Sequence, residues 1–480
     1  MEFLAANLAP LIFASLVAFL LLGYPVAFAL AANGIVFGLV GIALGVLPIQ
    51  LFQALPDRVF GVMSNETLLA VPFFTFMGLI LERSGMAEDL LDTIGQLFGT
   101  VRGGLAYAVI LVGAMLAATT GVVAASVISM GLISLPIMQR YGYDMRLASG
   151  VIAASGTLAQ IIPPSLVLIV MADQLGKSVG DMYQGAMLPG LLLTGGYAAY
   201  VLLVTLVRPA WAPALPAAAR TLRGRRLALR VVTALIPPLL LIFLVLGTIY
   251  LGIATPTEGG AMGATGALML AVVRRRLSFA LLRQAMESTA RLTTFVVFIL
   301  IGARIFSLTF YGVDGHVWVE RLLHHLPGGQ TGFLVVVNLL VFLLAFFLDF
   351  FELAFILVPL LGPAAVKLGI DPIWFGVILA VNMQTSFMHP PFGFALFYLR
   401  SVAPPSVRSG DIYWGAVPFV VIQLLTVTLL IAFPQLVTGG LGRSDPAHVY
   451  RAATFAPGEA PSEDDDPGRA FLRRMAGDGR

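Results

Sequence analysis

A set of residues occurs twice in this chain at a constant separation, and in both copies it leads into a double proline. The first copy contains Pro136, Gly142, Asp144, Ala153 and Pro163-Pro164, and the second contains Pro363, Gly369, Asp371, Ala380 and Pro390-Pro391, each 227 positions later. Both copies continue into Asp-x-Tyr-x-Gly-Ala, which begins at Asp181 and again at Asp411. This long-range repetition predicts two related halves, each with an interrupted helix.

The composition predicts that both halves lie in a membrane. Hydrophobic residues make up 59% of the 480 positions and charged residues only 11%, too little charge to cover a soluble protein of this size. Apolar runs of about 20 residues recur, each long enough to cross about 30 Å of hydrocarbon. We therefore expect an all-α polytopic membrane protein. Two matched halves with broken helices are typical of secondary transporters whose site lies between the halves.

Several kinds of chemistry have no support in the residues. The chain has no cysteine, and its five histidines show no metal-ligand spacing. It also lacks a Gly-x-Ser-x-Gly sequence, a Walker sequence and paired carboxylates at glycosidase spacing. We expect no enzymatic activity and no nucleic-acid partner. An energised process would have to use an ion gradient or a partner protein.

The repeat divides the chain into two halves, a linker and a tail. We expect the first inverted repeat at 1–207, with scaffold helices at 8–82 (a first span at 8–32), a hairpin at 104–139, a broken helix at 146–172 and a helix at 186–207. The second is expected at 231–437, with a hairpin at 331–365, a broken helix at 373–399 and a helix at 412–436. Residues 208–230 form an arginine-rich linker, and the acidic tail 438–480 is predicted to be disordered.

Positive charge predicts the orientation of the halves. The linker and Arg274-Arg275-Arg276 are expected in the cytoplasm. Arg102 and Arg140 flank the first hairpin on both sides, so it should enter and leave from the cytoplasm. The second hairpin has only Lys367 nearby and is expected to enter from the other side. The repeats are therefore predicted to be inverted. No basic segment precedes the first span, so no cleavable signal peptide is expected.

The helix breaks are the candidate binding site. Non-helical backbone is tolerated at membrane depth only when protein buries it or when it lines a wet cavity. Freed carbonyl groups suit Na⁺, and half-helix N-termini suit an anion. The candidate lining is Ser155, Thr157, Gln160, Pro163, Pro164 and Ser165 in the first copy and Asn382, Gln384, Thr385, Ser386, Pro390 and Pro391 in the second. The alternative is a kinked helix packed by small residues.

The middle of each hairpin supplies further candidates. Thr119, Thr120 and Gly121 interrupt the first hairpin, where glycine permits a turn and hydroxyl groups can cap or coordinate. Ordinary packing of small residues is the alternative. Asp349 lies in the matching part of the second hairpin. An acid in an apolar segment indicates cation coordination or orientation of the tip. A structural ion pair with Arg291 or Arg304 is the alternative.

Two ionisable residues receive other interpretations. Glu258 lies in a short loop before an apolar run, where capping of the next helix is the favoured role. His389 precedes Pro390. A proton-coupling role is conceivable for it, but a pocket-lining or hydrogen-bonding histidine is favoured.

Four segments carry a family resemblance. They are Ile161-Ile162-Pro163-Pro164-Ser165, Leu188-Pro189-Gly190, Ala254-Thr255-Pro256-Thr257-Glu258-Gly259 and Gln384-Thr385-Ser386-Phe387-Met388-His389-Pro390-Pro391-Phe392-Gly393. Over about residues 5–437 the chain resembles the large (M) subunit of tripartite ATP-independent periplasmic (TRAP) transporters. The segment from Phe392 to Tyr398 resembles the mannitol/chloroaromatic branch, which is also linked to 2-oxo and hydroxy acids.

The resemblance implies an elevator-type transporter of the bacterial inner membrane, built from two re-entrant hairpins and two broken helices. It implies Na⁺-coupled import of a small organic anion, such as a 2-oxo acid, a hydroxy acid or a C4-dicarboxylate. No cofactor is implied. Na⁺, as the coupling ion, would bind between the tips (Thr119–Gly121 and Leu348–Phe350) and the breaks at Pro163 and Pro390. At the first tip many relatives have a Ser- and Gly-rich stretch, from which Thr119-Thr120-Gly121 departs.

The resemblance also implies partners. They are a small (Q) membrane subunit, a periplasmic substrate-binding protein and the surrounding lipids. Because the first repeat begins close to Met1, the small subunit is expected as a separate chain. The rival functions are an ion-independent channel or facilitator and an assembly subunit. A facilitator would show flux without an ion gradient and without a binding protein.

Overall fold

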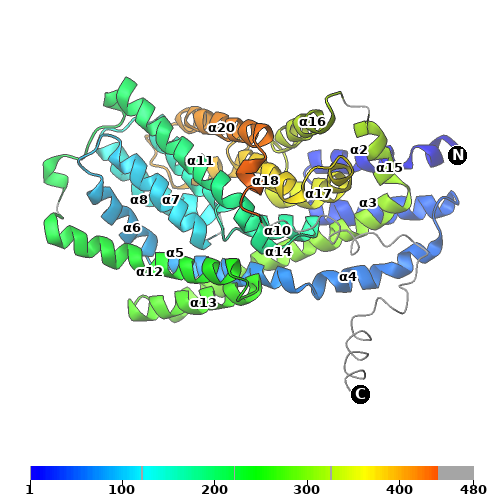
Figure 1. The fold of residues 1–480 in the computed structure, drawn as a ribbon, viewed down its shortest axis with the longest axis horizontal. Helices are drawn as coiled ribbons and strands as arrows, with labels where there is room; N and C mark the ends of the chain where they lie inside the picture. The colour runs from blue at the N-terminus through cyan, green and yellow to red at the C-terminus, as the bar shows by residue number, and fades with distance from the viewer. Residues whose placement is uncertain (1, 121–122, 221, 325–326, 442–480) are drawn as a thin grey trace, which may run out of the picture. The chain divides into compact units, whose positions relative to one another are not determined.

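The computed structural model describes residues 2–120, 123–220, 222–324 and 327–441, and within those ranges the regular elements are all helices (Figure 1). Seven of the described helices are long and apolar enough to cross a membrane, or eight if one bent pair counts as a single span. The bent pair is Ile49–Met63 with Glu66–Arg83, which meet at 40°. The expected all-α membrane fold is confirmed.

The elements before the first hairpin are α1 (Glu2–Ala6), α2 (Leu8–Leu21), α3 (Val26–Ala43), the 3₁₀ turn η1 (Ile49–Ala54), α4 (Leu55–Met63), the 3₁₀ turn η2 (Glu66–Leu69), α5 (Ala70–Arg83) and α6 (Met86–Leu97). The expected single span at 8–32 is wrong, because the helix stops after Leu21 and a new one starts at Val26. Gly23 has a φ of +80°, and Pro25 has no N–H and occupies the N-cap of α3.

The first hairpin and broken helix comprise α7 (Gly104–Thr120), α8 (Val123–Arg140), α9 (Met145–Thr157), the 3₁₀ turn η3 (Leu158–Gln160), α10 (Leu166–Leu175) and α11 (Val179–Val207). Helices α7 and α8 pack against each other, as Figure 1 shows. Helix α11 begins seven residues before the expected start at 186, because the Ser178 hydroxyl accepts a hydrogen bond from the Asp181 N–H and caps it.

The corresponding elements of the second half are α16 (Gly329–Leu344), α17 (Phe350–Lys367), α18 (Pro372–Met383), the 3₁₀ turn η6 (Gln384–Phe387), α19 (Phe394–Val402), α20 (Ser409–Ala432) and α21 (Gln435–Thr438). Helix α17 begins 227 residues after α8 (350 − 123), and α18 begins 227 residues after α9 (372 − 145). Asp144 and Asp371 cap α9 and α18 with their side chains. Both double prolines contain a cis peptide bond. The sequence repeat therefore corresponds to a repeated series of elements.

Between the repeated parts lie two 3₁₀ turns, η4 (Pro209–Trp211) and η5 (Ala217–Ala219), followed by α12 (Gly224–Tyr250), α13 (Pro256–Val273), α14 (Phe279–Gly312) and α15 (Gly315–His324). Helix α12 includes the end of the expected linker 208–230. The expected capping role of Glu258 is confirmed, because Thr255 and Glu258 form a capping box at the start of α13. Of the expected tail 438–480, residues 442–480 lie outside the described residues.

Helices α9 and α18 lie in the interior of the unit formed by residues 1–441. All residues of α9 from Leu147 to Thr157 and all residues of α18 from Ile373 to Met383 are buried. Helix α9 crosses α20 so closely that a β-carbon on Gly150 would lie 2.1 Å from the Gly415 carbonyl oxygen. Helix α18 packs against α10, α11, α17 and α20. This packing holds both helix breaks in the protein interior.

Candidate functional site at the helix breaks

Ser165 forms hydrogen bonds to residues on both sides of the first break. Its hydroxyl donates a hydrogen bond of 2.5 Å to the Gln160 carbonyl oxygen and accepts one of 3.4 Å from the Leu168 N–H, which caps α10. The Tyr183 hydroxyl donates to the Ser165 carbonyl oxygen at 3.4 Å. Two carbonyl groups near Pro163-Pro164 therefore have partners within the protein. The break is a defined, hydrogen-bonded turn between two half-helices.

At the second break the hydroxyl groups turn back onto their own helix. Thr385 Oγ1 donates to the Asn382 carbonyl oxygen at 2.7 Å, and Ser386 Oγ donates to the Met383 carbonyl oxygen at 2.7 Å. In the first half, Thr157 Oγ1 likewise donates to the Ala154 carbonyl oxygen at 2.8 Å. Each hydroxyl oxygen keeps lone pairs that can still accept a hydrogen bond or coordinate a cation.

The two breaks meet through a glutamine. Gln384 is fully buried, and its Nε2 donates a hydrogen bond of 3.0 Å to the Thr157 carbonyl oxygen, at the end of α9. Gln423 of α20 extends the network, since its Nε2 donates to the Tyr197 hydroxyl at 3.0 Å and lies 3.5 Å from Gln384 Oε1. The network therefore combines α9, α11, α20 and η6 in one buried polar cluster.

Four side-chain oxygens at or near the breaks have no hydrogen-bond partner among the described residues: Ser155 Oγ, Gln160 Oε1, Asn382 Oδ1 and Gln423 Oε1. All four residues are buried. The amide nitrogen of Asn382, in contrast, donates to both oxygens of Asn338 on α16, at 2.7 and 2.9 Å. Buried polar atoms without partners are uncommon in proteins and call for a bound water or ion. Neutral oxygens fit a hard monovalent cation in their chemistry.

The second hairpin tip overlaps the expected Leu348–Phe350 and begins three residues earlier, at residue 345. Helix α16 ends at Leu344, residues 345–349 are not helical, and α17 begins at Phe350. Asp349 is the N-cap of α17: its Oδ1 accepts from the Glu352 N–H at 2.8 Å, and Glu352 Oε2 accepts from the Asp349 N–H at 2.9 Å. Among the described residues Asp349 makes no ion pair with Arg291 or Arg304.

His389 joins the second break to the second hairpin through ring contacts. It is 1% exposed, and its ring stacks on Phe346 with centroids 4.1 Å apart and an interplanar angle of 19°. Phe342 contacts the same ring edge-on at 4.4 Å. His389 is thus buried between aromatic rings, and the pocket-lining or hydrogen-bonding role favoured for it stays a prediction. Phe342 and Phe346 gave no signal in the sequence, because phenylalanine is common throughout such helices.

The first hairpin tip is less fully described. Thr119 and Thr120 are the last residues of α7, and Gly121 lies outside the described residues. The proposed roles of these three residues stay predictions. Helix α8 nevertheless approaches the first break closely, since a β-carbon on Gly156 would lie 2.3 Å from Val127 Cγ2.

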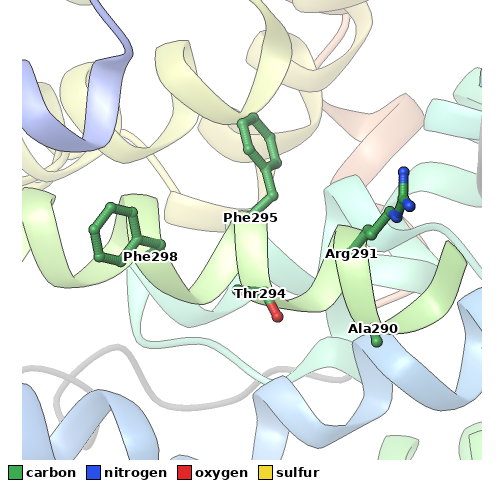
Figure 2. Close-up of a pocket in the computed structure, with 5 residues that line it drawn as sticks. All are labelled: Ala290, Arg291, Thr294, Phe295 and Phe298. Atoms are coloured by element: carbon green, nitrogen blue, oxygen red, sulfur yellow. The ribbon is translucent and has the colours of Figure 1, made fainter. Parts of the chain in front are cut away.

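A groove lies along α14, apart from the residues predicted to line the site. It is shallow and open, and its lining residues, Ala290, Arg291, Thr294, Phe295 and Phe298, all belong to α14 (Figure 2). Figure 2 shows Arg291 and Phe295 extending from the same side of the helix. From the sequence Arg291 was considered only as a partner for Asp349. The helical spacing of Arg291, Phe295 and Phe298 was the signal available for finding this surface.

The comparison with known families decides the identity of the chain. Residues 13–436 match the model described as the tripartite ATP-independent periplasmic transporter, DctM component. The chain belongs to this family. It is a TRAP transporter large permease subunit, hence a multi-pass protein of the bacterial inner membrane and not an enzyme. The mannitol/chloroaromatic branch stays a prediction.

Two relatives and one solved structure define the likeness. The C4-dicarboxylate TRAP transporter large permease protein DctM of Pseudomonas aeruginosa is 32% identical, over 82% of this chain and 91% of the relative. The 2,3-diketo-L-gulonate TRAP transporter large permease protein YiaN of Escherichia coli is 27% identical, over 77% of this chain and 85% of the relative. The YdaH transporter of Alcanivorax borkumensis shares the fold, with a TM-score of 0.56 and 18% identity over 80% of this chain and 88% of YdaH.

Proposed function

We propose that this TRAP large subunit imports a small organic carboxylate across the inner membrane and couples the import to an inward Na⁺ gradient. The observation that carries the proposal is the set of buried, unpartnered oxygens at two helix breaks that occupy equivalent positions of a repeat. An unpaired buried polar group costs about 1–3 kcal/mol, so a bound ion would stabilise these oxygens.

The proposed Na⁺ ligands come from both halves. Ser155 Oγ and Gln160 Oε1 belong to the first broken helix, and Asn382 Oδ1 belongs to the second. The hairpin tips near Thr119–Gly121 and Asp349 would complete the coordination. Among the described residues no group of three or more His, Cys, Asp or Glu could hold a metal ion, so a site built from neutral oxygens is the favoured arrangement.

The substrate class follows from the relatives. Two related permeases are named for a C4-dicarboxylate and for 2,3-diketo-L-gulonate, both organic anions. For this chain we propose a carboxylate of the 2-oxo, hydroxy or dicarboxylic type. The half-helix N-termini of α10 and α19, which follow the two breaks, would face its negative charge.

The transport cycle is proposed to be an elevator. The hairpins and broken helices would move relative to the remaining helices, which stay fixed, and would carry the substrate across the membrane. The tripartite description of the family supports two partners, a small membrane subunit and a periplasmic substrate-binding protein. The buried contact between Gln384 and the first break supports movement of both broken helices as one body, since their separation would leave polar groups unpaired.

Uptake by reconstituted protein tests the proposal. The chain and its small subunit would be placed in liposomes, and initial rates of uptake would be measured for labelled 2-oxo acids and C4-dicarboxylates. The four conditions combine presence and absence of inward Na⁺ with presence and absence of the binding protein. The proposal expects uptake only when both are present. Uptake that needs neither would identify a facilitator and overturn the proposal.

A further inference from the structure

A polar contact joins the second half of the first broken helix to the helices that precede the first hairpin. Asn65 Nδ2 donates a hydrogen bond of 2.5 Å to Asp173 Oδ1, across 108 positions of the chain. Asn65 immediately precedes η2, which leads into α5, and Asp173 belongs to α10. In the proposed transport cycle η2 and α5 stay fixed, whereas α10 moves with the broken helix. The contact therefore crosses the boundary between a fixed and a moving part of the carrier.

Other hydrogen bonds hold both side chains in place for this contact. Asn65 is the N-cap of η2, and its Oδ1 accepts a hydrogen bond of 3.0 Å from the Thr67 N–H. Gln174 Nε2 donates to Asp173 Oδ2 at 2.8 Å, so each oxygen of the carboxylate accepts a side-chain hydrogen bond. Hydrogen bonds to a carboxylate are about twice as strong as those between neutral groups. The contact is also partly buried, which limits competition from water.

Asp173 occupies a position of α10 that does not favour a negative charge. It lies two residues before the end of the helix at Leu175. The last carbonyl groups of a helix carry partial negative charge, so they repel a nearby carboxylate. Helix formation therefore does not account for an acid at this position. The donors from Asn65 and Gln174 compensate the charge, and only the donor from Asn65 comes from another part of the fold.

The contact lies at the periplasmic end of α5. Helix α6, which follows α5, is joined to Arg274 by an ion pair of 3.4 Å with Asp89. Arg274 is expected in the cytoplasm. The end of α5 that leads into α6 therefore faces the cytoplasm, and the opposite end, beside Asn65, faces the periplasm.

Movement of α10 toward the cytoplasm would separate Asp173 from Asn65. Helix α10 packs beside both η2 and α5. The segment from Ala70 to Leu81 in α5 has no charged residue. A carboxylate that lost its donor and moved along this apolar segment would be costly. The hydrogen bond therefore stabilises the position of α10 that the structure shows.

We infer that Asn65 and Asp173 form a latch, a contact that holds the first broken helix at the periplasmic end of α5 and must break in each crossing. This inference rests on the proposed function, because it names a resting position for the proposed carrier. Loss of the latch should let the carrier leave that position more readily.

Distances between spin labels test the inference. The chain has no cysteine, so labels at Glu66→Cys in η2 and Lys177→Cys, two residues after α10, have no background. The full chain with its small subunit would be placed in liposomes without Na⁺, and the ratio of longer to short label distances would be measured. We expect the short distance of the latched position to dominate in the protein with Asn65 and Asp173 unchanged.

Two substitutions separate the latch from the local cap. Asn65→Asp keeps a side chain that caps as well as asparagine, but it removes the donor and places two carboxylates together. It should raise the ratio of longer to short distances about 10-fold. Asn65→Asp combined with Asp173→Asn exchanges donor and acceptor, and it should return the ratio to within twofold of the starting value. Thr257→Val is the matched control, because Thr257 Oγ1 donates to the Glu66 carbonyl oxygen at 2.7 Å from α13, which stays fixed. It should change the ratio less than twofold.

The outcomes distinguish this inference from the proposed function. An unchanged ratio in Asn65→Asp, or no recovery in the exchanged pair, would overturn the inference. A single short distance in every variant, in a protein whose uptake of 2-oxo acids or C4-dicarboxylates requires Na⁺, would also overturn it and leave the proposed function standing. A ratio that follows the latch, in a protein whose uptake needs neither Na⁺ nor the binding protein, would support the inference and refute the proposed function.

Discussion

Gln384 Nε2 donates a hydrogen bond of 3.0 Å to the carbonyl oxygen of Thr157, and these two residues occupy equivalent positions of the two repeats, 227 residues apart. A side chain of the second broken helix thus supplies the hydrogen-bond donor for a carbonyl group at the end of α9, in the first broken helix. Because Gln384 is fully buried, the Thr157 carbonyl group has no access to water if this donor is lost.

Replacement of Gln384 by leucine should therefore destabilise the protein by about 1–3 kcal/mol, the cost of leaving a buried acceptor unpaired. It should also reduce carboxylate uptake, since both breaks would shift. Gln330→Leu is the matched control, because Gln330 also donates to a backbone carbonyl, that of Leu368 at 2.8 Å, but at an exposed position. Thermal unfolding and uptake rates check the prediction. Equal losses in both variants would contradict a special role for the buried bond.

The double proline of the second break should be essential for transport. With Pro390 and Pro391 both changed to alanine, the chain regains two N–H groups and can continue η6 into a regular helix, which would remove the turn before α19. Uptake should fall to background, although the protein still inserts. Pro363→Ala is the control, because Pro363 lies inside α17 without interrupting it. Wild-type uptake by the double variant would refute the importance of the break.

The capping role of Asp349 can be separated from a role of its charge. Asparagine caps helices about as well as aspartate, so Asp349→Asn should keep wild-type stability, whereas Asp349→Ala should lose about 0.5–2 kcal/mol. Thr255→Ala, in the capping box of α13, should show a similar loss. If the Asp349 carboxylate takes part in Na⁺ coupling, Asp349→Asn should raise the Na⁺ concentration needed for half-maximal uptake. An unchanged Na⁺ dependence would remove the carboxylate from the coupling site.

The crossing of α9 and α20 should not tolerate a side chain at Gly150. A β-carbon there would lie 2.1 Å from the Gly415 carbonyl oxygen, so the helices would have to move apart. Gly150→Ala should destabilise the protein by about 1–3 kcal/mol. Gly195→Ala, in α11, meets nothing within 4 Å and should be neutral or slightly stabilising. Melting temperatures of the two purified variants would check this, and equal values would contradict the packing argument.

The repeated elements could be predicted from the sequence because prolines and capping aspartates act locally. Asp144 and Asp371 each cap a helix within three residues of their own position, so their 227-residue separation in the chain reappears in the structure. Gly23 and Pro25 were equally local signals. They were missed because they lie within one long apolar run, which the expectation of a span at 8–32 treated as continuous.

The contacts of the candidate site could be predicted only in part. The spacing of Asp349 and Glu352 is that of a capping box and was visible in the sequence, but the acid was interpreted as a cation ligand or an ion-pair partner. The bond from Gln384 to Thr157 and the stacking of His389 on Phe346 depend on how distant helices pack. No local pattern encodes that packing, so these contacts required the structure.

Steady-state accumulation tests the central claim of ion-coupled transport most directly. Liposomes that contain the chain and its small subunit would receive a labelled 2-oxo acid or C4-dicarboxylate, the binding protein and an inward Na⁺ gradient, and the internal and external concentrations would be compared at plateau. A Na⁺-coupled carrier predicts an internal concentration above the external one, which collapses when an ionophore dissipates the Na⁺ gradient. A plateau at equal concentrations, unaffected by the ionophore, would contradict the account and identify a passive pathway.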